Sequence, residues 1–202
     1  PIITMATPAV DWSDAWNYYE LAQITDGLFI MGYNYFYSGS STAGPVSPLG
    51  GYYYDLDYTV DDYIDKTEGQ LDKIILGLPY YGYDWPVTDS LINSETTDFG
   101  IARIYGETHS MVQNYGNIWD ESSNSQWIAY EMSNWQQCWY DDSLSLSHKY
   151  QYAIENELLG IGIWALGYDY GHDELWGTIY DQFVSSLIGD LNFDDNINIL
   201  DV

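Results

Sequence analysis

Basic residues are scarce in this chain. Its 202 residues include 4 Lys and Arg against 31 Asp and Glu, which gives a formal net charge of −27 at pH 7. A surface of that sign repels nucleic acid phosphates and anionic lipid headgroups, so we expect neither a nucleic acid nor a membrane partner. Dissolved salt screens such self-repulsion. The charge therefore favours an extracellular or saline setting.

The chain has a single cysteine and no long apolar run. Cys138 is the only cysteine, so an intrachain disulfide is excluded, and we expect this residue to be a buried structural thiol. No uninterrupted run reaches the roughly 18 apolar residues that a membrane span needs. The chain opens at Pro1 within a predicted strand, with neither an initiating Met nor a signal peptide. We therefore expect a piece of a longer, secreted protein.

Apolar and aromatic residues are abundant, and they alternate between strand-like and helix-like segments. The chain is 46% hydrophobic, with 22 Tyr and 9 Trp. The predicted strands are residues 1–10, 26–37, 73–85 and 161–170. The predicted helices are residues 11–25, 58–70, 143–160 and 173–189, with Asp11 or Ser13, Thr59 and Ser143 as the first three N-caps and Gly160 as the stop of the third helix. This order predicts an α/β fold with a parallel sheet.

Residues 85–136 break the alternation and predict an inserted small α+β lobe. The remaining strands number half of those in an eight-stranded (β/α)8 TIM barrel. In such a barrel the active site lies where the strands end. Here the apolar strand of "KIILGLPYYGYDW" ends in a cluster of four aromatic residues. A hydrophobic plug is the alternative interpretation of that cluster.

Several segments resemble one enzyme family. The stretches "IMGYNYFY", "KIILGLPYYGYDW", "WYDDSLSLSHKYQYAIENELLGIGIWALGYD" and "DELW" are similar to strands five to eight of glycoside hydrolase family 18, the family of chitinases and related N-acetylglucosamine-polymer hydrolases. The resemblance covers residues 1–187 and implies the C-terminal half of a TIM barrel. The lobe, residues 85–136, matches only in position.

The resemblance implies substrate-assisted, retaining hydrolysis of β-1,4 bonds, an exception to the two-carboxylate scheme. In the family a Glu protonates the glycosidic oxygen while the acetamido carbonyl of the substrate attacks the anomeric carbon. That Glu ends a D-G-x-D-x-D-x-E motif, which this sequence lacks. We therefore expect the acid to lie upstream, on a segment that precedes Pro1, and we expect the chain to be inactive by itself.

The family's Met-x-Tyr-Asp motif corresponds to Met31, Tyr33 and Asn34. The resemblance implies that the Tyr33 hydroxyl contacts the substrate's acetamido group. Asn34 departs from the family's Asp and carries no charge. Since a neighbouring like charge raises the pKa of an acid, its loss should lower the pKa of the catalytic Glu and shift the pH optimum of the intact enzyme to more acidic values.

Four further aromatics match the family's sugar-binding positions or lie beside them. Trp164 corresponds to the Trp that floors the sugar at the scissile bond, and an indole offers a large flat surface for stacking. Tyr81 matches a strand-seven Tyr, and Tyr83 replaces a frequent Arg. Trp85 is a candidate for the same cleft. For three of the tryptophans core packing remains an equal alternative: Trp85, Trp127 and Trp135.

The last residues, 188–202, predict the start of a calcium-binding repeat. Oxygen ligands occupy positions 1, 3, 5, 7, 9 and 12 of such a loop: Asp190, Asn192, Asp194, Asn196, Asn198 and Asp201. The pattern resembles a truncated dockerin repeat, which implies a cohesin-like partner. Asp195 stands where a Gly is usual, and an acidic linker is the alternative.

Two questions of function stay open at this stage. Chitin is the first choice of substrate, but "YGYDW" also resembles family members that act on peptidoglycan. The rival from another class is a non-catalytic, lectin-like protein that binds chitin or peptidoglycan with the same aromatic cleft. Asn34 favours this rival, because a site without a catalytic acid would tolerate loss of the Asp.

Overall fold

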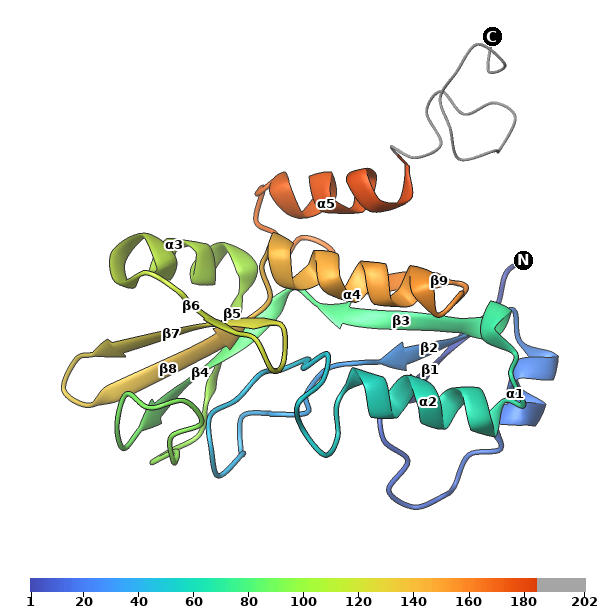
Figure 1. Cartoon of the computed structure of the whole chain (residues 1–202), viewed down its shortest axis with the longest axis horizontal. Helices are drawn as coiled ribbons and strands as arrows, with labels where there is room; N and C mark the ends of the chain where they lie inside the picture. The colour runs from blue at the N-terminus through green and yellow to red at the C-terminus, as the bar shows by residue number, and fades with distance from the viewer. Residues whose placement is uncertain (185–202) are drawn as a thin grey trace, which may run out of the picture.

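The computed structural model describes residues 1–184 and contains two sheets (Figure 1). The first is a parallel sheet in the order β1-β2-β3-β9. Its strands are β1 (Thr4–Pro8), β2 (Gly27–Met31), β3 (Ile74–Pro79) and β9 (Gly160–Trp164). Pro8 is paired with Met31, and Pro79 with Trp164, so these strands end at one common edge.

Successive strand residues point to opposite faces of the sheet. Helices cover one of these two faces. They are α1 (Tyr18–Ile24), α2 (Leu56–Lys66), α4 (Ser143–Glu155) and α5 (Glu174–Phe183). Leu76 and Leu78 of β3 pack into one core cluster with residues of α2 and α4. The other face carries Phe29, whose ring lies against Gly77 and Gly162, where an added Cβ would come within 2.2 Å and 2.1 Å of it. Both glycines are therefore required for that ring to fit.

The predicted helices are present but begin and end at other residues. In α1, α2 and α4 the observed N-cap is an Asx side chain that accepts a backbone N–H three residues ahead, as capping requires. The caps are Asn17, Asp55 and Asp142, in place of the predicted Asp11 or Ser13, Thr59 and Ser143. The third predicted helix ends at Glu155, and its predicted stop, Gly160, begins β9 instead.

The second sheet is antiparallel and occupies the region predicted as the lobe. Its order is β5-β4-β8-β7-β6. The strands are β4 (Tyr81–Val87), β5 (Ile101–Ile104), β6 (Ile118–Asp120), β7 (Ser125–Glu131) and β8 (Trp135–Tyr140), with α3 (Tyr105–Tyr115) between β5 and β6. The segment 73–85, predicted as one strand, is thus divided at Tyr80 between two sheets.

The lobe has its own aromatic core. The rings of Trp127 and Trp139 stack with centroids 5.3 Å apart and an interplanar angle of 10°. Trp85 is buried in the same cluster. Cys138 is fully buried, as predicted, and burial raises the pKa of its thiol. It is therefore an unreactive core residue.

All four basic side chains contact partners within the chain. Lys66 pairs with Asp62 at 2.9 Å, and Arg103 with Asp84 at 3.1 Å. The other two contacts are Lys73 Nζ with the Thr25 carbonyl, and Lys149 with Asp141. The Lys149–Asp141 pair joins α4 to the end of β8 and is buried, with side-chain exposures of 0% and 2%. Among residues 1–184, no helix has the length and apolar character to cross a bilayer.

We predict that Asp141→Ala destabilises the fold by about 3–5 kcal/mol, because it leaves the Lys149 charge buried without a partner. Asp62→Ala removes the carboxylate of the more exposed Lys66–Asp62 pair and should cost less than about 1 kcal/mol. Urea denaturation of both variants measures the difference. Equal losses in the two variants would contradict the structural role of the buried pair.

Candidate active site

Three aromatic side chains from different segments meet at the carboxyl edge of the parallel sheet. Tyr33 follows β2, Tyr81 begins β4, and Trp164 ends β9. The ring centroid of Tyr33 lies 6.1 Å from that of Tyr81 and 6.5 Å from that of Trp164. Trp164 is 52% exposed and Tyr33 is half-buried. We call these three residues the aromatic edge; it presents ring surface to solvent where the strands end.

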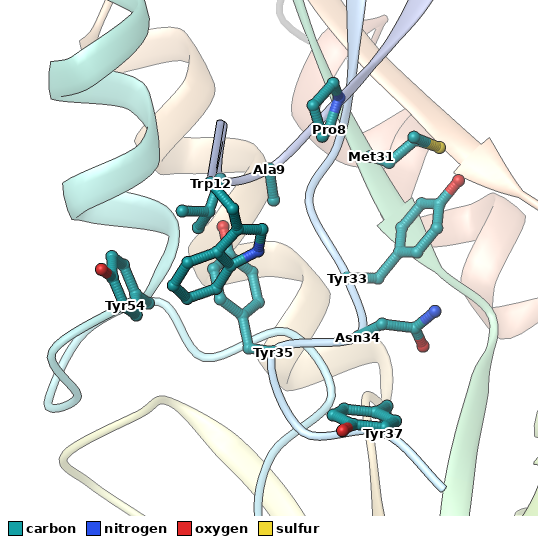
Figure 2. Close-up of a pocket in the computed structure, with 10 residues that line it drawn as sticks. Pro8, Ala9, Trp12, Met31, Tyr33, Asn34, Tyr35, Tyr37 and Tyr54 are labelled. Atoms are coloured by element: carbon teal, nitrogen blue, oxygen red, sulfur yellow. The ribbon is translucent and has the colours of Figure 1, made fainter. Parts of the chain in front are cut away.

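A pocket of about 580 Å³ adjoins the aromatic edge (Figure 2). Met31, Tyr33 and Asn34, the three residues predicted from the motif, all line it. On the opposite side the exposed Trp12 packs edge-on against Tyr54, with ring centroids 4.7 Å apart. Four lining aromatics were missed by the sequence reasoning: Trp12, Tyr35, Tyr37 and Tyr54.

Asn34 and Tyr81 are joined by a hydrogen bond that the sequence reasoning also missed. The Tyr81 hydroxyl donates to Asn34 Oδ1 at 2.6 Å. This bond fixes the amide oxygen and leaves the two N–H groups of the amide free to face the pocket. Asn34 has φ +64°, a left-handed conformation that Asn and Asp tolerate better than most residues. An Asp would fit the same backbone and accept the same hydrogen bond.

The hydroxyl groups of the edge remain neutral donors. Burial raises the pKa of Tyr33. Burial also raises the pKa of Tyr81, with smaller contributions from neighbouring tyrosines. Both phenols are therefore protonated at any physiological pH and can donate to a carbonyl oxygen.

At the end of β9 the carbonyl of Trp164 accepts a hydrogen bond from the backbone N–H of Tyr80 at 2.8 Å. The peptide bond between Trp164 and Ala165 is cis. The backbone of Trp164 is thus bonded to Tyr80, the residue that follows β3, while its indole stays open to solvent.

Strand β4 carries three of the predicted aromatics: Tyr81 and Tyr83 lie at the edge, and Trp85 lies in the core. Tyr83 is partly exposed, and its ring lies 5.8 Å from that of Tyr81, so it extends the aromatic edge. Trp85 is fully buried, and its Nε1 donates to the Ser38 carbonyl at 3.2 Å. The prediction of Trp85 as a substrate-binding residue is therefore corrected, because the segments around Ser38 and Gly100 cover this end of the strand face. Trp127 is buried too, and Trp135 packs partly buried against the same cluster.

On the opposite face of β4, Asp84 forms a buried polar network. Its Oδ2 accepts hydrogen bonds from the Tyr130 hydroxyl at 2.9 Å and from Arg103 at 3.1 Å. Burial raises the pKa of Asp84, against the opposing effects of Tyr130 and Arg103. The single arginine of the chain is thus held within the lobe, and no arginine stands beside Tyr83.

The predicted calcium ligands, Asp190, Asn192, Asp194, Asn196, Asn198 and Asp201, lie outside the described residues. The calcium site and the dockerin-like repeat therefore stay predictions.

The sequence profile of the family described as Glycosyl hydrolases family 18 matches residues 2–169. The chain belongs to glycosyl hydrolase family 18. The resemblance inferred from its motifs is thereby confirmed at the level of the family.

Family 18 relatives of this chain differ in what their names say they do. The chain is 28% identical over 186 residues to a cortical fragment-lytic enzyme of Bacillus subtilis, covering 89% of the chain and 40% of that enzyme. A chitinase from Cycas revoluta in complex with (GlcNAc)3 matches with a TM-score of 0.81 at 18% identity, over 90% of this chain and 55% of that one. A chitinase-like agglutinin from Robinia pseudoacacia gives a TM-score of 0.76 at 21% identity over the same shares.

These structural matches establish the fold, an α/β fold similar to that of family 18 chitinases. The chain spans about half the length of the solved structures and less of the curated relative.

We predict unequal losses of stability for two tryptophans of this region. Trp85→Ala should cost about 3–5 kcal/mol, because it leaves a cavity in the lobe core. Trp164→Ala should cost less than about 1 kcal/mol, since half of that side chain already faces solvent. Chemical denaturation of the two variants is the measurement. If Trp85→Ala unfolds as readily as the wild-type protein, the core assignment is wrong.

Proposed function

We propose that this chain forms one wall of the substrate cleft of a retaining glycoside hydrolase that cleaves β-1,4 bonds in N-acetylglucosamine polymers, with chitin as the first choice. The observation that carries the proposal is the aromatic edge, which stands at the carboxyl ends of parallel strands, beside an open pocket, in a chain of family 18. Carbohydrate recognition requires such surfaces, since apolar sugar faces stack on aromatic rings.

In this proposal Trp164 forms the floor under the sugar at the scissile bond. Its exposed indole suits stacking, and its backbone is tied to the sheet. The (GlcNAc)3 complex of the Cycas chitinase supports an N-acetylglucosamine polymer as the ligand. Tyr83 and Met31 would line the same cleft at its sides.

Tyr33 would donate its hydroxyl proton in a hydrogen bond to the acetamido carbonyl of the substrate. That carbonyl oxygen attacks the anomeric carbon, the glycosidic bond breaks, and an acid protonates the leaving oxygen. The product is an oxazolinium ion, which water then opens. A donor that holds the carbonyl oxygen in line for attack lowers the barrier by positioning.

The acid is not among these residues, because the D-G-x-D-x-D-x-E sequence does not occur in them. We propose that another segment of the natural protein supplies it, together with the other strands of a barrel in which this chain forms strands five to eight. By itself the chain would then be inactive. The proposed setting is extracellular, with Ca²⁺ and a cohesin-like partner assigned to residues 188–202.

With Asn34 the site would stabilise the reaction intermediate less than a site with an Asp would. Its neutral amide cannot offset the positive charge of the oxazolinium ion, and it does not raise the pKa of the acid. We therefore propose an acidic pH optimum for the natural enzyme.

A lectin-like function is the second candidate, and Asn34 is the observation that favours it. The fold similarity to an agglutinin is compatible with it. Peptidoglycan is the alternative substrate, supported by the relationship to a cortical fragment-lytic enzyme.

The natural protein that contains this chain should hydrolyse N-acetylglucosamine oligomers. Tyr33→Phe should lower kcat by about 100-fold while binding changes little, because one donor to the reacting group is lost. Trp164→Ala should weaken binding by about tenfold through loss of stacking. Steady-state kinetics and calorimetric titration with chitooligosaccharides measure both effects.

Tyr180→Phe is the matched control, since this exposed hydroxyl lies on α5, and its kinetics should equal those of the wild-type protein. Tight binding without any turnover would overturn the hydrolase proposal and support the lectin-like candidate. Absence of binding as well as turnover would overturn both the hydrolase proposal and the lectin-like candidate.

Asn34→Asp should shift the pH optimum of the natural enzyme upward by about one unit and raise kcat. The added carboxylate disfavours loss of the proton from the catalytic acid, so the pKa of that acid rises and the alkaline limb of the profile moves to higher pH. A pH–rate profile measures the shift. Asn134→Asp adds the same charge at the exposed β7–β8 turn and should leave the profile in place. An unchanged profile for Asn34→Asp would count against the role given to Asn34.

A further inference from the structure

Two of the three histidines in the chain converge outside the proposed cleft. His109 lies on α3 of the lobe, and His172 lies in the connection between β9 and α5. Their ring centroids are 4.1 Å apart. Glu174, the first residue of α5, has its Oε1 atom 3.3 Å from His109 Nδ1 and 3.5 Å from His172 Nδ1. We call these three residues the His–Glu cluster; Figure 1 shows the start of α5 beside α3.

The geometry points to a zinc site in which His109, His172 and Glu174 are the ligands. One ligand atom from each residue lies within 4.8 Å of the other two. In a tetrahedral zinc site with bonds of about 2.0–2.1 Å, neighbouring ligand atoms are about 3.3 Å apart. The two nitrogen-to-oxygen distances of the cluster, 3.3 Å and 3.5 Å, match that spacing.

The donor set selects the class of ion. Two imidazoles and one carboxylate suit Zn²⁺ and its neighbours in the first transition row, whereas Ca²⁺ and Mg²⁺ prefer sites made of oxygen ligands. Three protein ligands leave the fourth position of a tetrahedral zinc site to water. The three side chains are between 29% and 39% exposed, so the ion can enter from solvent.

A supporting contact already orients the carboxylate. The hydroxyl of the buried Tyr105 donates to Glu174 Oε1 at 3.0 Å. Hydrogen bonds of this kind orient metal-ligating carboxylates in proteins. The Glu174 carboxylate is therefore held in place beside the two histidines.

A zinc ion at this position would join the lobe to the parallel sheet. His109 belongs to α3, while the other two ligands follow β9, the strand that ends in Trp164. Tyr170 in the same connection packs closely on Gly106 of α3, where an added Cβ would lie 2.4 Å from the Tyr170 Cβ. The ion would thus reinforce an existing contact between α3 and the connection that follows β9.

The test is a titration of the metal-free natural protein with ZnCl2, followed by calorimetry and by thermal unfolding. We expect saturable binding at this site and a rise in Tm of about 5–10 °C when Zn²⁺ exceeds its Kd by 100-fold. His109→Ala and Glu174→Gln should each weaken that binding by more than about 100-fold, since even loss of a supporting residue costs 10- to 100-fold.

His148→Ala is the matched control, because His148 lies on α4 against Trp119, with ring centroids 5.7 Å apart. It should bind Zn²⁺ as the wild-type protein does. MgCl2 at the same ionic strength reports on attraction to the acidic surface, and it should not raise Tm by the same amount.

Unchanged Zn²⁺ affinity in both His109→Ala and Glu174→Gln would overturn the proposal, as would an equal Tm rise with MgCl2. Substitution of Co²⁺ in the wild-type protein keeps the test independent of variant folding. An intense visible absorption of a four- or five-coordinate ion is expected. A weak spectrum of hydrated, six-coordinate Co²⁺ would also overturn the site.

Discussion

The backbone of Tyr80 hydrogen-bonds to the parallel sheet on one side and to the lobe on the other. Its N–H donates to the carbonyl of Trp164 at 2.8 Å, and its carbonyl accepts the N–H of Tyr105 at 3.0 Å. The side chain is fully buried, with its hydroxyl 3.3 Å from that of Tyr150. Tyr80 thus connects the end of β3, the end of β9 and the start of α3, and it fixes the point at which the chain passes from one sheet to the other.

The aromatic edge depends on that junction. Tyr81 follows Tyr80 directly, and Trp164 is its hydrogen-bond partner, so both rings are set by backbone contacts of the same residue. Sites carried on strands hold their side chains more rigidly than sites on loops. The hydrogen bond from Tyr81 to Asn34 also ties the segment that follows β2 to these two residues. The aromatic edge is therefore organised by contacts within the chain itself.

The sequence predicted the parallel strands, the helices between them and most of the aromatic edge, because continuous apolar runs and family motifs mark them. It did not predict the division at Tyr80, since residues on both sides of it are extended and apolar. Trp85 was a candidate for the cleft because it belongs to the aromatic cluster in which the strand ends, but segments distant in sequence, around Ser38 and Gly100, cover it. The caps were misassigned because several residues able to cap lie close together near each helix start, such as Asp142 beside Ser143. The His–Glu cluster was missed because His109 is 63 residues before His172 in the sequence and meets it only in the folded chain.

The engagement of every Lys and Arg within the chain has a consequence for polymer recognition. The surface that remains offers carboxylates and tyrosine hydroxyls but no basic side chain that is free of an internal partner. An uncharged polysaccharide approaches such a surface without electrostatic opposition. A polymer that carries carboxylates or phosphates is repelled over a Debye length of about 8 Å at physiological ionic strength. Charge would thus sort candidate polymers at long range, before a single sugar ring reaches the cleft.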